Sequence, residues 1–291
     1  MQASGPDENA SRLLIEQYGL LGGILTTAGK ATAAEELFHK QARLLDGLYE
    51  RHAGDPSSVL GLVTILERAA FPLEKAKQAS AALARLRQAA DLLVRFANLP
   101  SRNPKFKGDV ASLSLTLSAP LLRLHAAAES LTMANLARRA HEEACSGFSG
   151  TDRDWFLSSC WYRTAKACWA LGQYDESLAA LREGLAAQRR MFDNAPELVE
   201  NRVVLSVRYD RLAYFTRLRC NYQEAEAMLL EREKLWPNNA EQLLKIAQDF
   251  EELAEMARKA SPRPTVARQE GIRRYGDHGV RIRRVAETLS H

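Results

Sequence analysis

The chain has 291 residues, of which 46% are hydrophobic and 26% are charged, with only 16 glycines and 10 prolines. This composition is enough to bury a core, and it excludes long disordered stretches. The formal net charge is +4, but residues 258–291 contain nine basic and three acidic side chains. That segment carries +6 and the rest of the chain −2, so any attraction to nucleic acid or anionic lipid is expected there.

The N-terminal residues show no basic patch followed by an apolar core, so no signal peptide is predicted. The apolar stretch Leu20–Leu25 is far too short to cross a bilayer. The cysteines follow neither a disulfide nor a metal-binding spacing; they are Cys145, Cys160, Cys168 and Cys220. Together these features predict a cytoplasmic protein without a membrane span, bound metal or cofactor.

Apolar residues recur at spacings of three and four, which is the helical period, and no segment alternates like a strand. Helix pairs are predicted at 8–28 with 31–53, 57–71 with 73–98, 107–127 with 129–147, 152–171 with 174–192, and 197–219 with 222–235. One more helix covers 239–260. A final basic helix, broken near Gly276 and Gly279, covers about 265–289. Pro120 should kink or divide the helix that contains it.

Proline-rich loop signals suggest where this series divides. The strongest lies at 99–104, and a second at 261–264 separates the basic tail. The predicted organisation is N-terminal helical repeats at 1–100, helix pairs and a following helix at 101–260, and a basic helical tail at 261–291.

A short pattern recurs in three of the helix pairs. An aromatic residue is followed by small and medium residues, a turn, and a second helix with small and apolar residues facing back. The best copy uses Trp161, Ala165, Cys168, Gly172, Tyr174, Ser177, Leu181 and Gly184. The next uses Tyr209, Leu212, Ala213, Tyr222, Ala225, Leu229 and Pro237, and the first uses Tyr18, Leu21, Gly22, Gly29, Ala34 and Phe38. The turns at Gly172 and Cys220 are 48 residues apart, more than the ~34 residues of a standard unit.

This pattern resembles the tetratricopeptide (TPR) repeat family, specifically over about 155–240 and more loosely over 14–45. Cys220 departs from it, because a turn glycine is usual there. The resemblance implies an all-α TPR-like solenoid of about five helix pairs plus C-terminal helices, since each pair hides its apolar side by stacking on its neighbours.

A narrower resemblance, carried by Glu224–Glu226 and Leu230–Asn239, is to the repeat tails of planctomycete-type bacterial serine/threonine kinases. The glycine-rich loop, His-Arg-Asp and Asp-Phe-Gly motifs of a kinase domain are absent from the sequence, so kinase activity is not implied.

In TPR-like repeats the first helix of each pair lines a groove that binds a partner. The resemblance therefore implies, by helical phase, that unpacked side chains on these helices face the partner. Besides Glu16 and Thr26 in the first pair, these are Tyr162, Lys166, Trp169, Asp210, Tyr214 and Arg217. Aromatic and arginine side chains are common interface anchors. The alternative is that these residues only pack between helices.

The tail contains two arginine clusters, namely Arg273, Arg274, Arg281, Arg283 and Arg284. On a helix they share roughly one face, which could hold phosphates. The alternative is a solvated helix that caps the last repeat. Because Tyr275 is the one aromatic residue among them, stacking on single-stranded nucleic acid is poorly supported.

Other chemistry has little support in the sequence. His141 and Cys145 could share one helix face, but a structural zinc site needs about four ligands and no second pair has suitable spacing. No nucleophile elbow, zinc-protease motif or nucleotide loop is present in the sequence. The chain is therefore interpreted as a non-catalytic scaffold that binds a protein or peptide. The alternatives are a regulatory segment of a bacterial kinase pathway and a nucleic-acid-associated protein that uses its basic tail.

Overall fold

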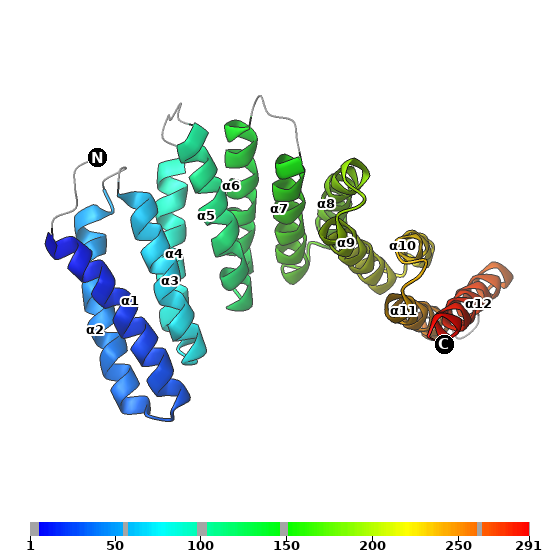
Figure 1. The fold of residues 1–291 in the computed structure, drawn as a ribbon, viewed down its shortest axis with the longest axis horizontal. Helices are drawn as coiled ribbons and strands as arrows, with labels where there is room; N and C mark the ends of the chain where they lie inside the picture. Colours follow the sequence, from blue (N-terminus) through cyan, green and yellow to red (C-terminus); the bar gives the residue numbers. More distant parts are fainter. Residues whose placement is uncertain (1–5, 55–57, 98–103, 146–150, 261–263, 291) are drawn as a thin grey trace. The chain divides into compact units, whose positions relative to one another are not determined.

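The computed structural model describes residues 6–54, 58–97, 104–145, 151–260 and 264–290. Over these residues it contains twelve α-helices and no strand (Figure 1), so the predicted all-α class is confirmed. The helices are α1 (Pro6–Thr27), α2 (Ala31–His52), α3 (Val59–Lys75), α4 (Ala79–Ala97), α5 (Pro104–Arg123), α6 (Ala127–Ala144), α7 (Thr151–Ala170), α8 (Tyr174–Asn194), α9 (Val199–Leu218), α10 (Tyr222–Lys234), α11 (Ala240–Lys259) and α12 (Val266–Leu289).

The helices belong to two compact units. Unit 1 comprises residues 1–149 and 159–173, and unit 2 comprises 150–158 and 174–291. The first few residues of α7 therefore belong to unit 2 and the rest to unit 1. The seam predicted at 99–104 falls mainly on 98–103, which lie outside the described residues.

Five turns have the same backbone conformation. Each joins the two helices of a pair and contains one residue with φ between 60° and 76°: Gly29, Lys77, His125, Gly172 and Cys220. The N–H of the following residue donates to a carbonyl five residues earlier at 2.9 Å in all five turns. These are the marks of the Schellman motif, which ends a helix with one left-handed residue. Successive turns lie 48 residues apart, or 47 in one case, so one repeat length runs through both units.

The two middle repeats, which match the TPR-like pattern only weakly in sequence, therefore have the same turn as the clear ones. Lys77 and His125 stand where Gly29 and Gly172 stand in other repeats, although each carries a Cβ that disfavours positive φ. Cys220 likewise adopts the conformation of the glycine it replaces.

Two prolines lie inside helices, and the structure corrects the expectations about them. The first helix of the second pair runs on to Lys75 instead of ending at 71, because Pro72 costs one hydrogen bond while Leu73 becomes buried. Pro120 does not divide α5, which continues to Arg123, and its carbonyl accepts from the Leu124 N–H at 3.0 Å.

The final helix, α12, is unbroken, so the predicted break near Gly276 and Gly279 is wrong. A Cβ built on Gly279 would lie 3.1 Å from the carbonyl oxygen of Ala247 and 3.2 Å from Cγ of Glu251. The glycine therefore lets α12 lie close against α11, and the burial of Ile282 and Ala286 on the same face outweighs its low helix propensity.

Candidate partner-binding surface

The central helix of unit 2, α9, exposes a single narrow stripe. It packs against α8 and α10, and most of its circumference is buried. The exposed apolar residues are Val199, Val203, Val207, Tyr214 and Leu218, with exposed fractions between 38% and 57%. Their spacings of four and seven place them on one face of the helix.

This stripe is unusual because a helix enclosed by neighbours normally shows polar side chains on its remaining open side. Here three valines, a tyrosine and a leucine face water, with Glu200 at the start of the helix and Arg211 near its middle as the exposed charged residues. Contiguous exposed apolar surface of this kind marks sites where another molecule binds.

Beside the stripe lies a cluster of ionised groups from three helices. Arg232 of α10 is almost fully buried and donates to Asp210 of α9 at 2.9 Å and to Asp249 of α11 at 2.6 Å. Arg217 of α9 lies 2.9 Å from a carboxylate oxygen of Glu252 and 3.8 Å from one of Asp249. Burial raises the pKa of Asp249, although Arg232 opposes this effect. The cluster therefore ties α9, α10 and α11 together.

The three groove residues predicted on α9 divide between these two environments. Tyr214 lies on the exposed stripe. Asp210 and Arg217 lie beside it, and their charges are engaged in the ion cluster. The guanidinium of Arg217 also lies 5.2 Å from the centre of the Tyr214 ring, and this cation–π contact helps to orient the ring.

The other three predicted groove residues belong to unit 1. Tyr162, Lys166 and Trp169 are half-buried on α7, and the Lys166 ammonium lies 5.8 Å from the centre of the Tyr162 ring. The three predicted groove residues on α7 and the three on α9 thus belong to different compact units, and the two sets are treated as separate surfaces.

The sequence analysis assigned Tyr214 to the groove and made no prediction for the valines and the leucine of the α9 stripe. Apolar residues lie on every side of α9, so the helical period alone does not separate Val203 and Val207 from core residues. The repeat length offers a signal for these positions. One repeat of 48 residues before Val203 and Tyr214 stand Trp155 and Lys166, and neither of these is fully buried.

The predicted arginine patch is largely paired within unit 2. Arg274 bonds both carboxylate oxygens of Glu226 at 2.6 Å, and Arg281 bonds those of Glu233 at 2.8 Å. Arg283 donates to Glu251 at 2.6 Å. Arg273 and Arg284 are exposed, and neither has a carboxylate partner among the described residues.

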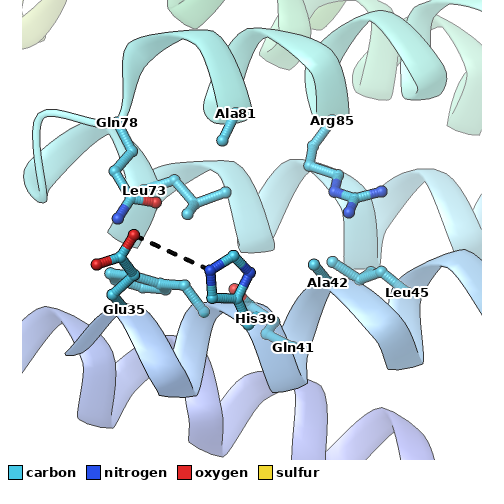
Figure 2. A pocket seen from close by; sticks show the side chains of 10 residues that line it. Glu35, His39, Gln41, Ala42, Leu45, Leu73, Gln78, Ala81 and Arg85 are labelled. Atoms are coloured by element: carbon cyan, nitrogen blue, oxygen red, sulfur yellow. Dashed lines mark ion pairs between the residues drawn. The ribbon is translucent and has the colours of Figure 1, made fainter. Parts of the chain in front are cut away.

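A cavity of about 290 Å³ lies between α2 and α4 in unit 1 (Figure 2). Its charged side chains are already satisfied within the fold: Glu35 lies 4.0 Å from His39, and Arg85 bonds Asp46 of α2. The amide of Gln41 is buried and donates to the Ile15 carbonyl at 3.0 Å. The groups that line this cavity therefore serve the packing of α1, α2 and α4.

Metal and thiol chemistry find little support in the described part of the chain. It contains no group of three or more His, Cys, Asp or Glu side chains placed to hold a metal ion. His141 and Cys145 lie 3.8 Å apart without a third ligand type nearby. Burial raises the pKa of Cys160 to about 12, so its thiol stays protonated. Among the described helices, none has the length and apolar content needed to cross a membrane.

No protein-family model and no curated protein sequence matches the chain. Among solved structures, BtubC (BKLC) from P. vanneervenii is similar at a TM-score of 0.50, with 15% identity over 87% of this chain and 92% of that one. The apo form of RapI has a TM-score of 0.49 and 10% identity, over 93% of this chain and 75% of that one. The S. pombe nuclear import adaptor Nro1 has a TM-score of 0.34 and 11% identity, over 98% and 95%. At such identities the likeness to BtubC concerns the helical-repeat fold alone.

Proposed function

We propose that the chain is a non-catalytic protein-interaction scaffold whose second unit binds a segment of a partner protein along α9. The observation that carries this proposal is the exposed apolar stripe from Val199 to Leu218 on a helix that is otherwise enclosed. Burying these side chains against a partner would remove from water an apolar surface that nothing described in unit 2 covers.

The stripe defines the chemistry of the partner. It runs the whole length of the 20-residue helix α9, roughly 28 Å at 1.5 Å of rise per residue. An amphipathic helix of about five turns, with apolar side chains at spacings of three and four, would match this length. Arg211 lies in the middle of the stripe, so a partner with an acidic residue near its centre fits best.

The ion cluster gives the stripe a fixed shape. Arg217 holds the Tyr214 ring, and Arg232 links α9 to α10 and α11. Since an anchor that is already ordered loses little conformational freedom on binding, this arrangement favours affinity. Arg217 and Asp210 therefore position the surface and need not touch the partner.

The test compares two variants in a quantitative pull-down from native lysate. The double variant Val203→Glu, Val207→Glu places two charges in the stripe, and the control Val280→Glu places one on the similarly exposed surface of α12. We expect proteins retained by the intact chain and by Val280→Glu to be lost from the stripe variant, with unchanged thermal melting. Equal retention by all three chains would refute the α9 site.

The proposal extends to unit 1 through Tyr162, Lys166 and Trp169, which present a tyrosine and a tryptophan beside a cation. A double variant Tyr162→Ala, Trp169→Ala would test whether this α7 surface contributes to the same binding.

The cysteine pattern favours a cytoplasmic site of action, because all four thiols are free.

Two alternatives rest on narrower observations. The motif shared with kinase repeat tails suggests a kinase pathway, but Glu226, Arg232 and Glu233 in that motif hold helices together, so packing accounts for them. Binding of an anionic polymer would rest on Arg273 and Arg284. It predicts an affinity that falls steeply with salt and is lost on removal of 262–291.

A further inference from the structure

The first helix of unit 1, α1, has an apolar face that no other described helix covers. It packs against α2 and α3 on one side. On the other side Leu13, Leu14, Leu20, Leu21 and Ile24 have exposed fractions between 42% and 61%. Together they leave in water the equivalent of roughly two to three whole aliphatic side chains.

This face is symmetric about Gln17. Leu14 and Leu20 lie three residues on either side of it, and Leu13 and Leu21 lie four residues away. At seven residues on either side stand Ala10 and Ile24, a small and a large side chain. The face therefore complements itself when a second α1 runs antiparallel to it about a two-fold axis through Gln17.

Gln17 suits the position on that axis. A glutamine side chain both donates and accepts hydrogen bonds, so two copies can bond each other across a two-fold axis. A single polar residue within an apolar helix interface also fixes the register of the pairing.

The charged side chains of α1 point away from this face. Over residues 9–27 of the helix these are Arg12 and Glu16, and Glu16 accepts a hydrogen bond from Arg68 of α3 at 2.9 Å. The Arg12 guanidinium reaches toward Gly61 of the same neighbouring helix. An uncharged face offers nothing to select a charged partner, whereas a second copy meets no like charges on it.

The last helix provides a contrast within the same chain. The open side of α12 carries charged residues, including Glu270, Arg273, Asp277 and Arg284, together with exposed Val266 and Val280. Helical repeats need a polar outer face at a terminus that stays in water. The open face of α1, from Leu13 to Ile24, differs from that of α12 because it carries no charged side chain.

We propose that two copies of the chain associate through α1, antiparallel, with Leu14 of each copy against Leu20 of the other. Such two-fold contacts between identical surfaces are the commonest form of self-association. The proposal does not depend on the partner-binding role of α9.

The experiment measures the mass of the full chain by light scattering over about 1–100 μM, the range in which a dimer of micromolar affinity forms. We expect the intact chain and the control Val280→Glu to form a dimer. Leu20→Glu and Leu14→Lys, each alone, should weaken association at least about 100-fold, because each places a charge against leucine. Circular dichroism melting confirms that each variant is folded.

Mixing the two variants distinguishes the antiparallel arrangement. In a mixed pair, the carboxylate introduced at position 20 of one copy faces the ammonium introduced at position 14 of the other. The remaining contacts stay apolar, so the dimer should return. An intact chain that is monomeric throughout, or a Leu20→Glu chain that still dimerises, would overturn the proposal. Two folded variants that fail to associate on mixing would overturn the antiparallel register.

Discussion

Of the buried arginines of unit 2, Arg232 provides the sharpest test of how this unit is held together. Arg232 has a side chain that is 9% exposed, and it donates to Ser206, Asp210 and Asp249, which lie on two different helices. Replacing it with methionine keeps most of the apolar stem but removes every one of these donors. Asp210 and Asp249 then remain close together without the cation between them.

Breaking a buried ion pair by removing one partner costs about 3–5 kcal/mol. Asp210 and Asp249 keep side-chain exposures of 29% and 21%, so water screens part of this loss. We therefore expect Arg232→Met to destabilise unit 2 by about 2–4 kcal/mol at pH 7.5. The same change at Arg281, whose pair with Glu233 is half-exposed, should cost no more than about 1 kcal/mol.

The penalty should depend on pH in a definite direction. Burial already raises the pKa of Asp249 above its ordinary value, and loss of Arg232 raises it further. A carboxyl group with a raised pKa stabilises the folded chain when protonated, and that contribution is lost as pH rises through the folded pKa. The destabilisation by Arg232→Met should therefore shrink as pH falls from 7.5 toward 5.

Hydrogen exchange measured by mass spectrometry on peptides from α9, α10 and α11 gives the local free energy of opening without assuming that the two units unfold together. Faster exchange in these peptides, about 30-fold or more at pH 7.5, corresponds to a loss of about 2 kcal/mol. A loss below about 1 kcal/mol, or one that is equal at pH 5 and pH 7.5, would refute this account of the cluster.

Three further predictions concern the turns, the last helix and the stripe. Cys220→Gly should stabilise unit 2 by about 0.5–1 kcal/mol, because glycine adopts a positive φ without strain. The control His39→Gly, in the middle of α2, should destabilise the fold by a similar amount, and thermal melting measures both changes. Gly279→Leu should detach α12 and increase proteolysis after residue 260, because a Cβ at this position would press against the backbone of α11. The control Gly276→Ala should leave proteolysis unchanged, because a Cβ there meets nothing within 4 Å. Val203→Glu, Val207→Glu should change the melting temperature little, because surface substitutions cost within about 0.5 kcal/mol each, while abolishing partner binding.

Much of the fold could be predicted because helical period and turn residues are local signals. Gly29, Gly172 and the repeat pattern around Cys220 identified three of the five equivalent turns. The other two were missed because Lys77 and His125 take the left-handed conformation through the packing of their helix pairs and not through intrinsic preference.

The site was harder to predict because one residue of error rotates a helix by about 100°. Tyr214 and Arg217 were assigned to the same face, yet only Tyr214 is exposed. The acids that draw Arg217 inward, Asp249 and Glu252, lie on α11 and are more than 30 residues away in the sequence. Long-range pairs of this kind leave no local signal.

The carboxylates of α10 have a consequence for the order in which helices stack. Glu224 and Glu231 bond Arg182 and Arg189 of α8 on one side. Glu226 and Glu233 bond arginines of α12 on the other side. These two edges of α10 pair with arginines, so two such edges placed against each other would repel. Charge complementarity therefore favours α8 and α12, with their arginines, as the neighbours of α10 along these two edges.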